Sequence, residues 1–309
     1  MYKVFIDGKE GTTGLQIFDR LAKRDDITLI TLPEDKRKDI KAREECLNSA
    51  DICFLCLPDE AAKESVALVK NPAVRIIDAS TAHRTNPDWV YGFPEISQIR
   101  REEIAATKRL ANPGCYATGF IAAVAPLVKG GFVEKDYPFV ATGLSGYSGA
   151  GKKTIAVYQS GDRDIALDSP RVYAHTLAHK HLPEMVRECG LESAPVFTPV
   201  ICDFYCGMTV SVPIYSRLMA KKASVNAIRE YFAEYYARQN FVIVPPESDI
   251  PAFIAANELA GTNKLKIYIS GNDERIFIAS VLDNLGKGAS GAAVQNMNIM
   301  LGLDERVSL

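Results

Sequence analysis

The 309-residue sequence lacks several features, and each absence excludes a class of protein. It has no run of about 18 apolar residues, the length that a membrane-spanning helix requires. The stretch after Met1 is interrupted by charge too soon to be a signal peptide. A net charge of −2, with no basic patch interleaved with aromatic residues, gives no bulk attraction to nucleic acids or acidic membranes. We therefore expect a cytoplasmic protein that binds neither nucleic acid nor membranes.

Cysteine and histidine are scarce, with seven and four residues. The cysteines are scattered and odd in number, which fits reduced thiols better than a disulfide framework. Cys53 and Cys56 have CxxC spacing, but they lie in a buried-strand pattern, where residues three apart point to opposite faces. We predict that both fill the core. No closed spacing of cysteine, histidine and carboxylate residues indicates a metal site.

The length of the chain predicts two domains, because a single core usually stops growing below this size. Strand and helix patterns alternate in the first part, which indicates an α/β fold with a parallel sheet. Strand-like segments follow one another in the second part, at residues 196–200, 207–214, 264–270 and 275–282. They indicate a mixed or antiparallel sheet with one face free to pair across an oligomer interface.

A glycine-rich turn follows the first apolar strand and opens an amphipathic helix. This order of elements suits a dinucleotide, because glycines let backbone N–H groups approach a pyrophosphate at the helix N-terminus. The spacing is GxxGxxG rather than GxGxxG. The candidate residues are Gly8, Gly11, Thr12, Thr13 and Gly14.

Two later strand ends are further candidates for the cofactor crevice. The strand at residues 27–32 is followed by Lys36 and Arg37, which could meet a 2′-phosphate and thus favour NADP over NAD, although a solvated loop has the same composition. The strand at residues 74–78 ends at Asp78-Ala79-Ser80. Ligands bind at the carboxyl ends of parallel strands, but Asp and Ser are also ordinary turn residues.

The turn Asn112-Pro113-Gly114 leads into Cys115 and an apolar helical stretch. Proline and glycine do not suit a helix interior, so Cys115 is predicted at or beside a helix N-terminus. The free N–H groups and the helix dipole stabilise a thiolate there and can bind an oxyanion. Cys115 is therefore a candidate nucleophile, with inert core cysteine as the alternative.

Three other stretches could serve such a nucleophile. The loop at residues 145–153 is rich in small residues and ends in two lysines, so it could wrap a phosphate or serve as a flexible linker. His175, His179 and His181 cluster, and histidine titrates in the range that proton transfer needs. Residues 286–291 form a glycine-rich helix start.

Several motifs together resemble the N-acetyl-γ-glutamyl-phosphate reductase family, in its shorter-chain group. They are the glycine turn, Asp78-Ala79-Ser80 with Arg84, Tyr91-Gly92-Phe93-Pro94-Glu95, Asn112-Pro113-Gly114-Cys115-Tyr116, Ser148-Gly149-Ala150-Gly151, His179-Lys180-His181, Phe197-Thr198-Pro199 and the end from Asn284 to Leu303. The resemblance runs essentially from end to end. Ala117 and Lys152 depart from the Pro and Arg that are common in the longer-chain members.

The resemblance implies a Rossmann-like NADP-binding domain, residues 1–115 with 286–309, and an α+β catalytic and dimerisation domain, residues 116–285. It implies an NADP(H)-dependent reduction of a small acyl phosphate in arginine biosynthesis, and a homodimer or homotetramer. Cys115 would form a thioester, and His179 or His181 would handle the proton, with His179 favoured. The last helix would pack on the nucleotide domain, with Lys287 and Gly288 near the nicotinamide. The candidates for substrate or phosphate contacts are Arg84, Asn112, Ser145, Ser148, Gly149 and Lys152.

Two alternatives remain open from the sequence. A related acyl-phosphate reductase could act on an aspartyl or aminoadipyl derivative, because one methylene changes binding by only about 1–3 kcal/mol. A non-catalytic, nucleotide-sensing protein would keep the dinucleotide fold, but it would have no need of Cys115 with a histidine partner.

Overall fold

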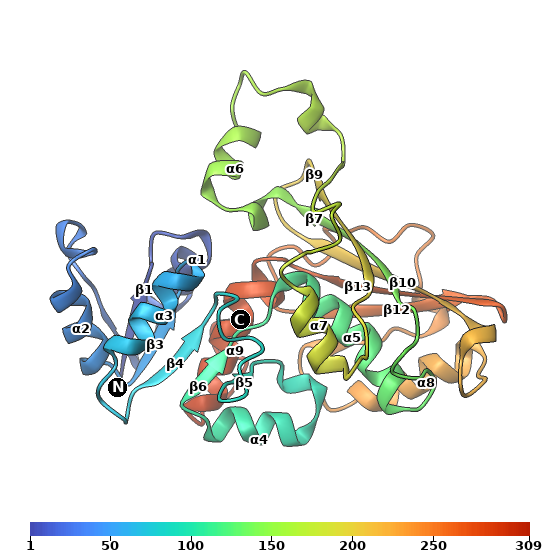
Figure 1. Ribbon diagram of the computed structural model, residues 1–309, viewed down its shortest axis with the longest axis horizontal. Coiled ribbons are helices and arrows are strands. Elements are labelled where there is room, and N and C mark those ends of the chain that lie inside the picture. The colour runs from blue at the N-terminus through green and yellow to red at the C-terminus, as the bar shows by residue number, and fades with distance from the viewer. The chain divides into compact units, whose positions relative to one another are not determined.

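The computed structural model describes residues 1–309 as two compact units (Figure 1). The N-terminal unit comprises Met1–Gly114 and Ala289–Leu309, and the central unit comprises Cys115–Gly288. The domain bounds expected from the sequence, residues 1–115 with 286–309 and 116–285, differ from these by one residue and by three residues.

The N-terminal unit is built on a six-stranded, all-parallel sheet with strand order β2-β1-β3-β4-β6-β5. Its strands are β1 (Tyr2–Asp7), β2 (Ile27–Ile30), β3 (Ile52–Leu55), β4 (Arg75–Asp78), β5 (Val90–Tyr91) and β6 (Arg109–Ala111). Its helices are α1 (Thr12–Leu21), α2 (Ile40–Ser49), α3 (Asp59–Leu68), α4 (Gln98–Ala106) and α9 (Gly291–Met300). The strand order reverses between β1 and β3, and such a switch point is where doubly wound sheets bind ligands.

Helices cover both faces of this sheet, so its strands are apolar on both sides. One core contains residues from α1, α4 and α9, and the other contains residues from α2 and α3. Cys53 belongs to the second core, whereas Cys56 packs against the first. Burial raises the pKa of the Cys56 thiol to about 12. The prediction that the two cysteines point to opposite faces is confirmed.

Helix α9 is buried although it carries three amide side chains. The amide of Gln295 donates to Glu95 and Glu305 at 2.9 and 2.8 Å, and that of Asn296 donates to the Gly92 carbonyl at 2.8 Å. The amide of Asn298 donates to backbone carbonyls of the C-terminal turn. Buried polar groups of this kind cost free energy unless they are hydrogen-bonded, so these contacts fix the position of α9 on the sheet.

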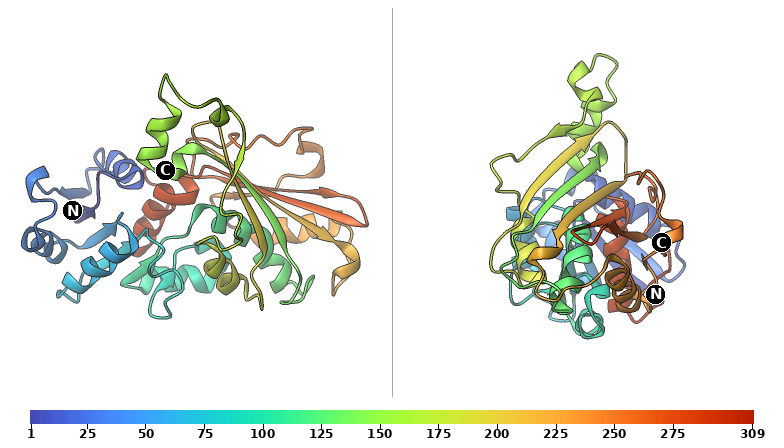
Figure 2. Two further views of the ribbon diagram at one scale, coloured as in Figure 1. Left: turned by 45° about the horizontal axis from the view of Figure 1, so that its top comes forward. Right: turned by 90° about the vertical axis from the view of Figure 1, so that its right-hand side faces the viewer.

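The central unit is built on a seven-stranded mixed sheet with strand order β11-β12-β13-β10-β7-β9-β8. Its strands are β7 (Val140–Gly146), β8 (Arg171–Val172), β9 (Val196–Cys202), β10 (Met208–Tyr215), β11 (Val242–Ile243), β12 (Leu265–Gly271) and β13 (Arg275–Leu282). Its helices are α5 (Cys115–Lys129), α6 (Lys152–Tyr158), α7 (Leu182–Cys189) and α8 (Val225–Tyr236). Helices α5, α7 and α8 lie on one face, and the segment that holds α6 extends away from the sheet (Figures 1 and 2).

Helix α5 is apolar all around, which is typical of a central buried helix. It packs closely on the sheet, because a Cβ atom at Gly119 would lie 2.7 Å from the Val210 side chain. Pro126 lies inside α5 and has no N–H to donate to the carbonyl of Ala122. The Tyr236 hydroxyl of α8 donates to that carbonyl instead, at 2.9 Å. No helix of the chain, α5 included, combines the length and apolar character needed to cross a membrane.

We expect Tyr236→Phe to lower the free energy of unfolding by about 1–2 kcal/mol, because it leaves the buried Ala122 carbonyl without its donor. The matched control is Tyr235→Phe, on the same helix, whose hydroxyl accepts a hydrogen bond from the exposed Lys129. The control should change the stability by less than about 0.5 kcal/mol. Urea unfolding of both variants measures the difference, and equal losses would contradict this role of Tyr236.

Candidate functional site

The glycine turn after β1 is shaped for close backbone approach. Gly8 has φ +85°, and a Cβ atom there would lie 2.4 Å from the carbonyl oxygen of Cys56. Gly11 precedes α1, and Thr12, Thr13 and Gly14 form its first turn. No side chain caps this helix, and the buried Thr12 hydroxyl has no hydrogen-bond partner. The turn thus presents backbone donors and a free hydroxyl, as a dinucleotide phosphate site requires.

A cavity of about 400 Å³ adjoins this turn within the N-terminal unit. It is lined by the ends of β1 and β2, by Phe18 of α1 and by Leu57 after β3. Of the two expected 2′-phosphate contacts, Arg37 lines the cavity and Lys36 does not. Three further cations line it, namely Lys9, Lys38 and Arg43. Arg43 is held in a buried pair with Asp7 at 2.9 Å, whereas Arg37 is half-exposed and pairs only with the exposed Glu34, at 3.8 Å. Arg37, Lys38 and Lys9 are therefore the cations that could meet an anion here.

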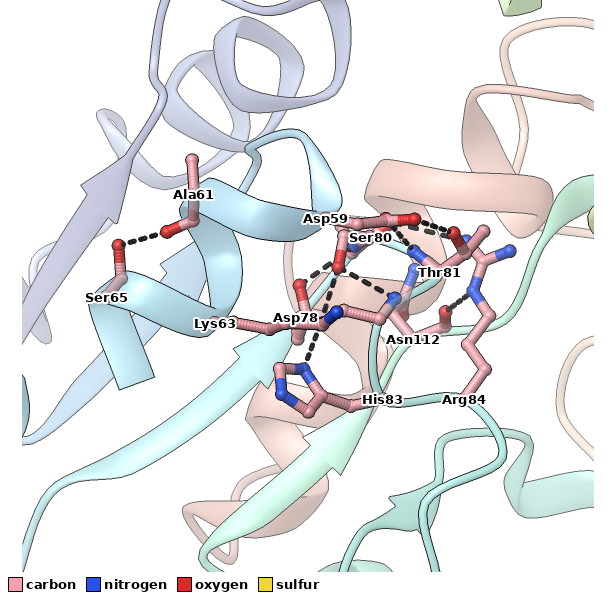
Figure 3. A network of polar contacts seen from close by, with 12 residues as sticks. Asp59, Ala61, Lys63, Ser65, Asp78, Ser80, Thr81, His83, Arg84 and Asn112 are labelled. Atoms are coloured by element: carbon pink, nitrogen blue, oxygen red, sulfur yellow. Dashed lines mark hydrogen bonds and ion pairs between the residues drawn. The ribbon is translucent and has the colours of Figure 1, made fainter. Parts of the chain in front are cut away.

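The loop after β4 is held by hydrogen bonds from several directions (Figure 3). The carboxylate of Asp78 accepts from the Ser80 backbone at 2.9 Å and from the Ser80 hydroxyl at 2.7 Å. His83 Nδ1 lies 2.6 Å from the same carboxylate. The carboxylate of Asp59, at the start of α3, accepts from the backbone and hydroxyl of Thr81. The loop that carries Ser80 is therefore fixed at the carboxyl ends of β3 and β4.

The side chains of Arg84 and Asn112 make hydrogen bonds inside the N-terminal unit. The Arg84 guanidinium is buried and donates to the carbonyls of Asn112 and Ala79 at 2.9 and 3.2 Å. The amide of Asn112 donates to the Ala289 carbonyl at 3.0 Å, and its oxygen accepts from Asn296 at 3.3 Å. Both residues were expected to contact substrate or phosphate. The contacts described here fix the loop that precedes Cys115, and the contact of either residue with substrate or phosphate stays a prediction.

Helix α5 begins at Cys115, as the turn before it predicts. The next residue, Tyr116, is buried, and its hydroxyl donates to the Val200 carbonyl at 3.3 Å. Burial, with smaller contributions from Tyr173 and Cys115, raises the pKa of Tyr116. Burial also raises the pKa of Tyr173 to about 12, and Cys115 contributes in the same direction. Both phenols are therefore protonated at neutral pH and able to donate hydrogen bonds near Cys115.

His179 and His181 form a ring pair in the central unit beside Tyr116. Their ring centroids are 4.7 Å apart and lie 5.7 and 6.1 Å from that of Tyr116. Both histidines are buried, whereas His175 is exposed. The backbone N–H of His181 donates to Nδ1 of His179 at 3.2 Å, so neutral His179 carries its proton on Nε2. The structure thus brings both candidate histidines to the helix start that carries Cys115.

The turn after β13 packs directly on Cys115. A Cβ atom at Gly288 would lie 2.7 Å from Cβ of Cys115 and 3.2 Å from its Cα. The Gly288 backbone is held by a 2.9 Å hydrogen bond from its N–H to the Asp283 carbonyl. Lys287 beside it is buried, with Nζ 5.8 Å from the Phe241 ring centroid. Only glycine leaves room for Cys115 at this contact.

If Cys115 is the nucleophile, we expect Gly288→Ala to lower kcat/KM by about 10²-fold, because the added methyl group displaces Cys115 by a fraction of an ångström. The matched control is Gly161→Ala, since a Cβ atom at Gly161 meets nothing within 4 Å. Steady-state assays of both variants measure the effect, and circular dichroism checks that they fold. Full activity of Gly288→Ala would contradict the close contact.

The loop at residues 145–153 has a buried and an exposed part. Ser145 and Ser148 are buried, and Ser148 accepts from the amide of Asn284 at 3.0 Å. Gly149 and Lys152 are exposed, and Lys152 begins α6. Asn284 also accepts from the Gly207 N–H at 2.8 Å. Asn284 therefore ties the end of β13 to this loop and to the start of β10.

Sequence reasoning missed two residues at these sites. Tyr173 lies near Cys115 across 58 positions of sequence, and no local pattern indicates such a contact. Lys38 lines the cavity from the same charged run as Arg37, so the run itself was the signal. The side-chain direction within a short turn decides which of its cations faces a cavity.

Two family descriptions match the chain. "Semialdehyde dehydrogenase, NAD binding domain" matches residues 31–107, and "Semialdehyde dehydrogenase, dimerisation domain" matches residues 115–284. Solved structures agree in fold. Aspartate semialdehyde dehydrogenase II from Vibrio cholerae has a TM-score of 0.75 at 16% identity, covering 98% of this chain and 99% of that one. The two family matches thus make the chain a semialdehyde dehydrogenase with a domain for a nicotinamide dinucleotide, and the fold agrees.

Curated relatives narrow the assignment. "N-acetyl-gamma-glutamyl-phosphate reductase 2" of Nostoc sp. is 45% identical over 318 residues, covering 99% of each chain. The "N-acetyl-gamma-glutamyl-phosphate reductase" of Sinorhizobium medicae is 47% identical over 305 residues, covering 97% of this chain and 98% of its own. That of Burkholderia cenocepacia is 45% identical over 303 residues, covering 97% of each. The chain therefore belongs to the N-acetyl-gamma-glutamyl-phosphate reductase family.

Proposed function

We propose that the protein reduces N-acetyl-γ-glutamyl phosphate to N-acetylglutamate 5-semialdehyde and phosphate with NADPH, a step of arginine biosynthesis. The observation that carries the proposal is Cys115 at the first residue of α5, with the buried pair His179 and His181 against the ring of Tyr116. A nucleophile at a helix start beside a proton-transfer group is the arrangement that covalent acyl transfer requires. The names of the curated relatives supply the substrate.

The mechanism begins when the Cys115 thiolate attacks the γ-acyl carbon. The bond from this carbon to the phosphate oxygen breaks, phosphate leaves, and a thioester remains on Cys115. Donors at the start of α5 stabilise the oxyanion that forms during the attack. The bound coenzyme supplies the hydride that reduces the thioester. His179 then donates its Nε2 proton to the resulting oxyanion and takes the same proton back as the carbon–sulfur bond breaks, which expels the Cys115 thiolate and releases the semialdehyde.

The residues of the N-terminal unit suit a dinucleotide. A side chain at Gly8 would fill the space over the Cys56 carbonyl, and the Thr12 hydroxyl is buried and free to donate. Gly11, Thr13 and Gly14 would complete the phosphate turn, and Ser80 would meet the coenzyme from the end of β4. We propose that NADP(H) is preferred, because Arg37 and Lys38 line the cavity beside β2 and could pair with a 2′-phosphate.

We expect Arg37→Ala to raise KM for NADP about tenfold and to leave KM for NAD nearly unchanged, since only NADP carries the 2′-phosphate. The matched control is Lys36→Ala, which removes a neighbouring cation that does not line the cavity. Initial rates with both coenzymes measure the effect. Equal losses with NAD and NADP, or a larger effect from Lys36→Ala, would contradict the assignment of Arg37.

We also propose that the protein is a homodimer or a homotetramer built on the sheet of the central unit. Helices lie on one face of that sheet, and residues 250–259 cover β12 and β13 on the other. Over β7, β9 and β10, and at Phe277 near the start of β13, that second face carries partly exposed apolar side chains. Val140 pairs with Val196, and Phe277 with Pro213, and each apolar pair leaves surface for a second copy to cover.

A substrate comparison tests the proposed function. Phosphate-dependent oxidation of the semialdehydes of N-acetylglutamate, aspartate and aminoadipate would be compared by kcat/KM, with Cys115→Ser as the background control. We expect N-acetylglutamate 5-semialdehyde to be preferred by at least about 100-fold, because the pocket must accept the acetyl group as well as the chain length. A preference for either other substrate would overturn the assignment.

A further inference from the structure

A buried network in the N-terminal unit joins Asp78, Ser80 and His83 (Figure 3), and the His83 ring contacts Trp89, the one tryptophan of the chain. The Asp78 side chain is fully buried, and the His83 side chain is 8% exposed. The ring of His83 stacks on Trp89, with centroids 4.1 Å apart and planes 16° from parallel. Trp89 itself packs in the core beneath β3 and β4. The imidazole thus packs on the Trp89 ring with one face and contacts the Asp78 carboxylate through Nδ1.

The carboxylate of Asp78 has two groups of donors on one loop. One comprises the backbone N–H and hydroxyl of Ser80, and the other is Nδ1 of His83. The Asp78 carbonyl also accepts from the Asn112 N–H, at 2.7 Å. A buried carboxylate without enough donors is costly, and loss of His83 would leave the Asp78 carboxylate with only the two donors of Ser80.

His83 and Arg84 hold opposite sides of the same loop. Figure 3 shows the two side chains pointing in different directions. His83 contacts the first residue of the loop, Asp78, whereas Arg84 donates to the carbonyls of Ala79 and Asn112. The loop between them carries Ser80. Its orientation therefore depends on both side chains. Ser80 lies in this loop just after the carboxyl end of β4, the edge of a doubly wound sheet where ligands bind.

We propose that His83 is a positioning residue for the coenzyme: by holding Asp78, it orients Ser80 toward the nicotinamide dinucleotide. The inference rests on the proposed function, because it assumes that Ser80 meets the coenzyme. His83 does not touch the coenzyme in this scheme. The Ser80 hydroxyl donates to Asp78 and accepts from the Ala82 N–H, so His83 sets the conformation of the loop in advance through Asp78. Its loss is therefore expressed as weaker coenzyme binding rather than as lost chemistry.

The test compares three variants. His83→Leu removes the donor to Asp78 and keeps an apolar contact for Trp89. His83→Asn places an amide N–H near the position of Nδ1 and so restores the donor. Asn48→Ala is the matched control for stability, because Asn48 makes hydrogen bonds between α2 and the end of α3 that do not involve the loop after β4.

Coenzyme binding would be measured by calorimetry with NADP⁺. A parallel titration would follow the fluorescence emission of Trp89. We expect the Kd for NADP⁺ to rise about tenfold in His83→Leu and to stay within about threefold of wild type in His83→Asn. Asn48→Ala should lower the melting temperature and leave Kd unchanged. The Trp89 emission should respond to NADP⁺ in the wild type, because the loop that meets the coenzyme is linked to the ring stacked on Trp89.

The outcomes separate this proposal from the proposed function. A wild type that binds neither NADP⁺ nor NAD⁺ contradicts both. A wild type that binds NADP⁺, with an unchanged Kd in His83→Leu, contradicts the positioning role alone. Equal weakening in His83→Leu and His83→Asn, or in Asn48→Ala, would also overturn it, because the effect would then reflect a general loss of structure.

Discussion

Cys115→Ser is expected to lower kcat by at least about 10⁴-fold while leaving coenzyme binding intact. The serine hydroxyl is a far weaker nucleophile at neutral pH than a thiolate at a helix start. The substitution exchanges one atom at the first residue of α5, so packing against Gly288 is preserved. Steady-state turnover and NADP⁺ binding by calorimetry would be measured on the same preparation.

The matched control for this prediction is Cys46→Ser. Cys46 is half-buried in α2, and burial raises the pKa of its thiol, as expected for a cysteine without a chemical role. The control should keep activity within about twofold of wild type. Residual activity of a few per cent in Cys115→Ser would exclude Cys115 as the nucleophile. Loss of coenzyme binding in that variant would indicate a structural role instead.

His179→Asn is expected to lower kcat/KM by about 10²–10⁴-fold, the usual contribution of a general acid and base. It should also flatten one side of the plot of kcat/KM against pH, because an amide does not titrate between pH 5 and 9. His181→Asn should lower kcat/KM by less, about tenfold, because the hydrogen bond between the two histidines does not involve the His181 side chain. The contact from residue 181 to Nδ1 of His179 is made by the backbone N–H, which the substitution retains.

His175→Asn is the control for the histidine pair. His175 lies in the same loop but is exposed, so its replacement should leave the rate and the pH profile unchanged. A larger loss in His181→Asn than in His179→Asn would reverse the roles of the pair. An unchanged pH profile in both variants would show that neither histidine transfers the proton.

Local patterns predicted most of the framework correctly. The apolar runs at residues 4–6, 51–57 and 74–78 form β1, β3 and β4, and the turn before Cys115 starts a helix as predicted. The parallel sheet of the first part is confirmed, and of the two alternatives for the second part, mixed or antiparallel, the structure has the mixed sheet. These features depend on hydrophobic period and on turn residues, which can be read from neighbouring positions.

Other features depend on distant partners and leave no local signal. The two-residue strands β5, β8 and β11 exist only because a longer strand pairs with each of them. The amides of Gln295 and Asn296 suggest from the sequence that one face of α9 meets water, whereas both are buried and donate to partners about 200 positions away. The contact of Gly288 with Cys115 likewise joins residues 173 positions apart. Such contacts appear only when the whole chain is folded.

The phosphate requirement of the reverse reaction tests the central claim most directly. The measurement is the rate of NADPH formation from N-acetylglutamate 5-semialdehyde and NADP⁺, with and without inorganic phosphate. A thioester on Cys115 that phosphate must resolve predicts turnover only when phosphate is present. Equal rates without phosphate would mean that water resolves the thioester, and the assignment as an acyl-phosphate reductase would then be wrong.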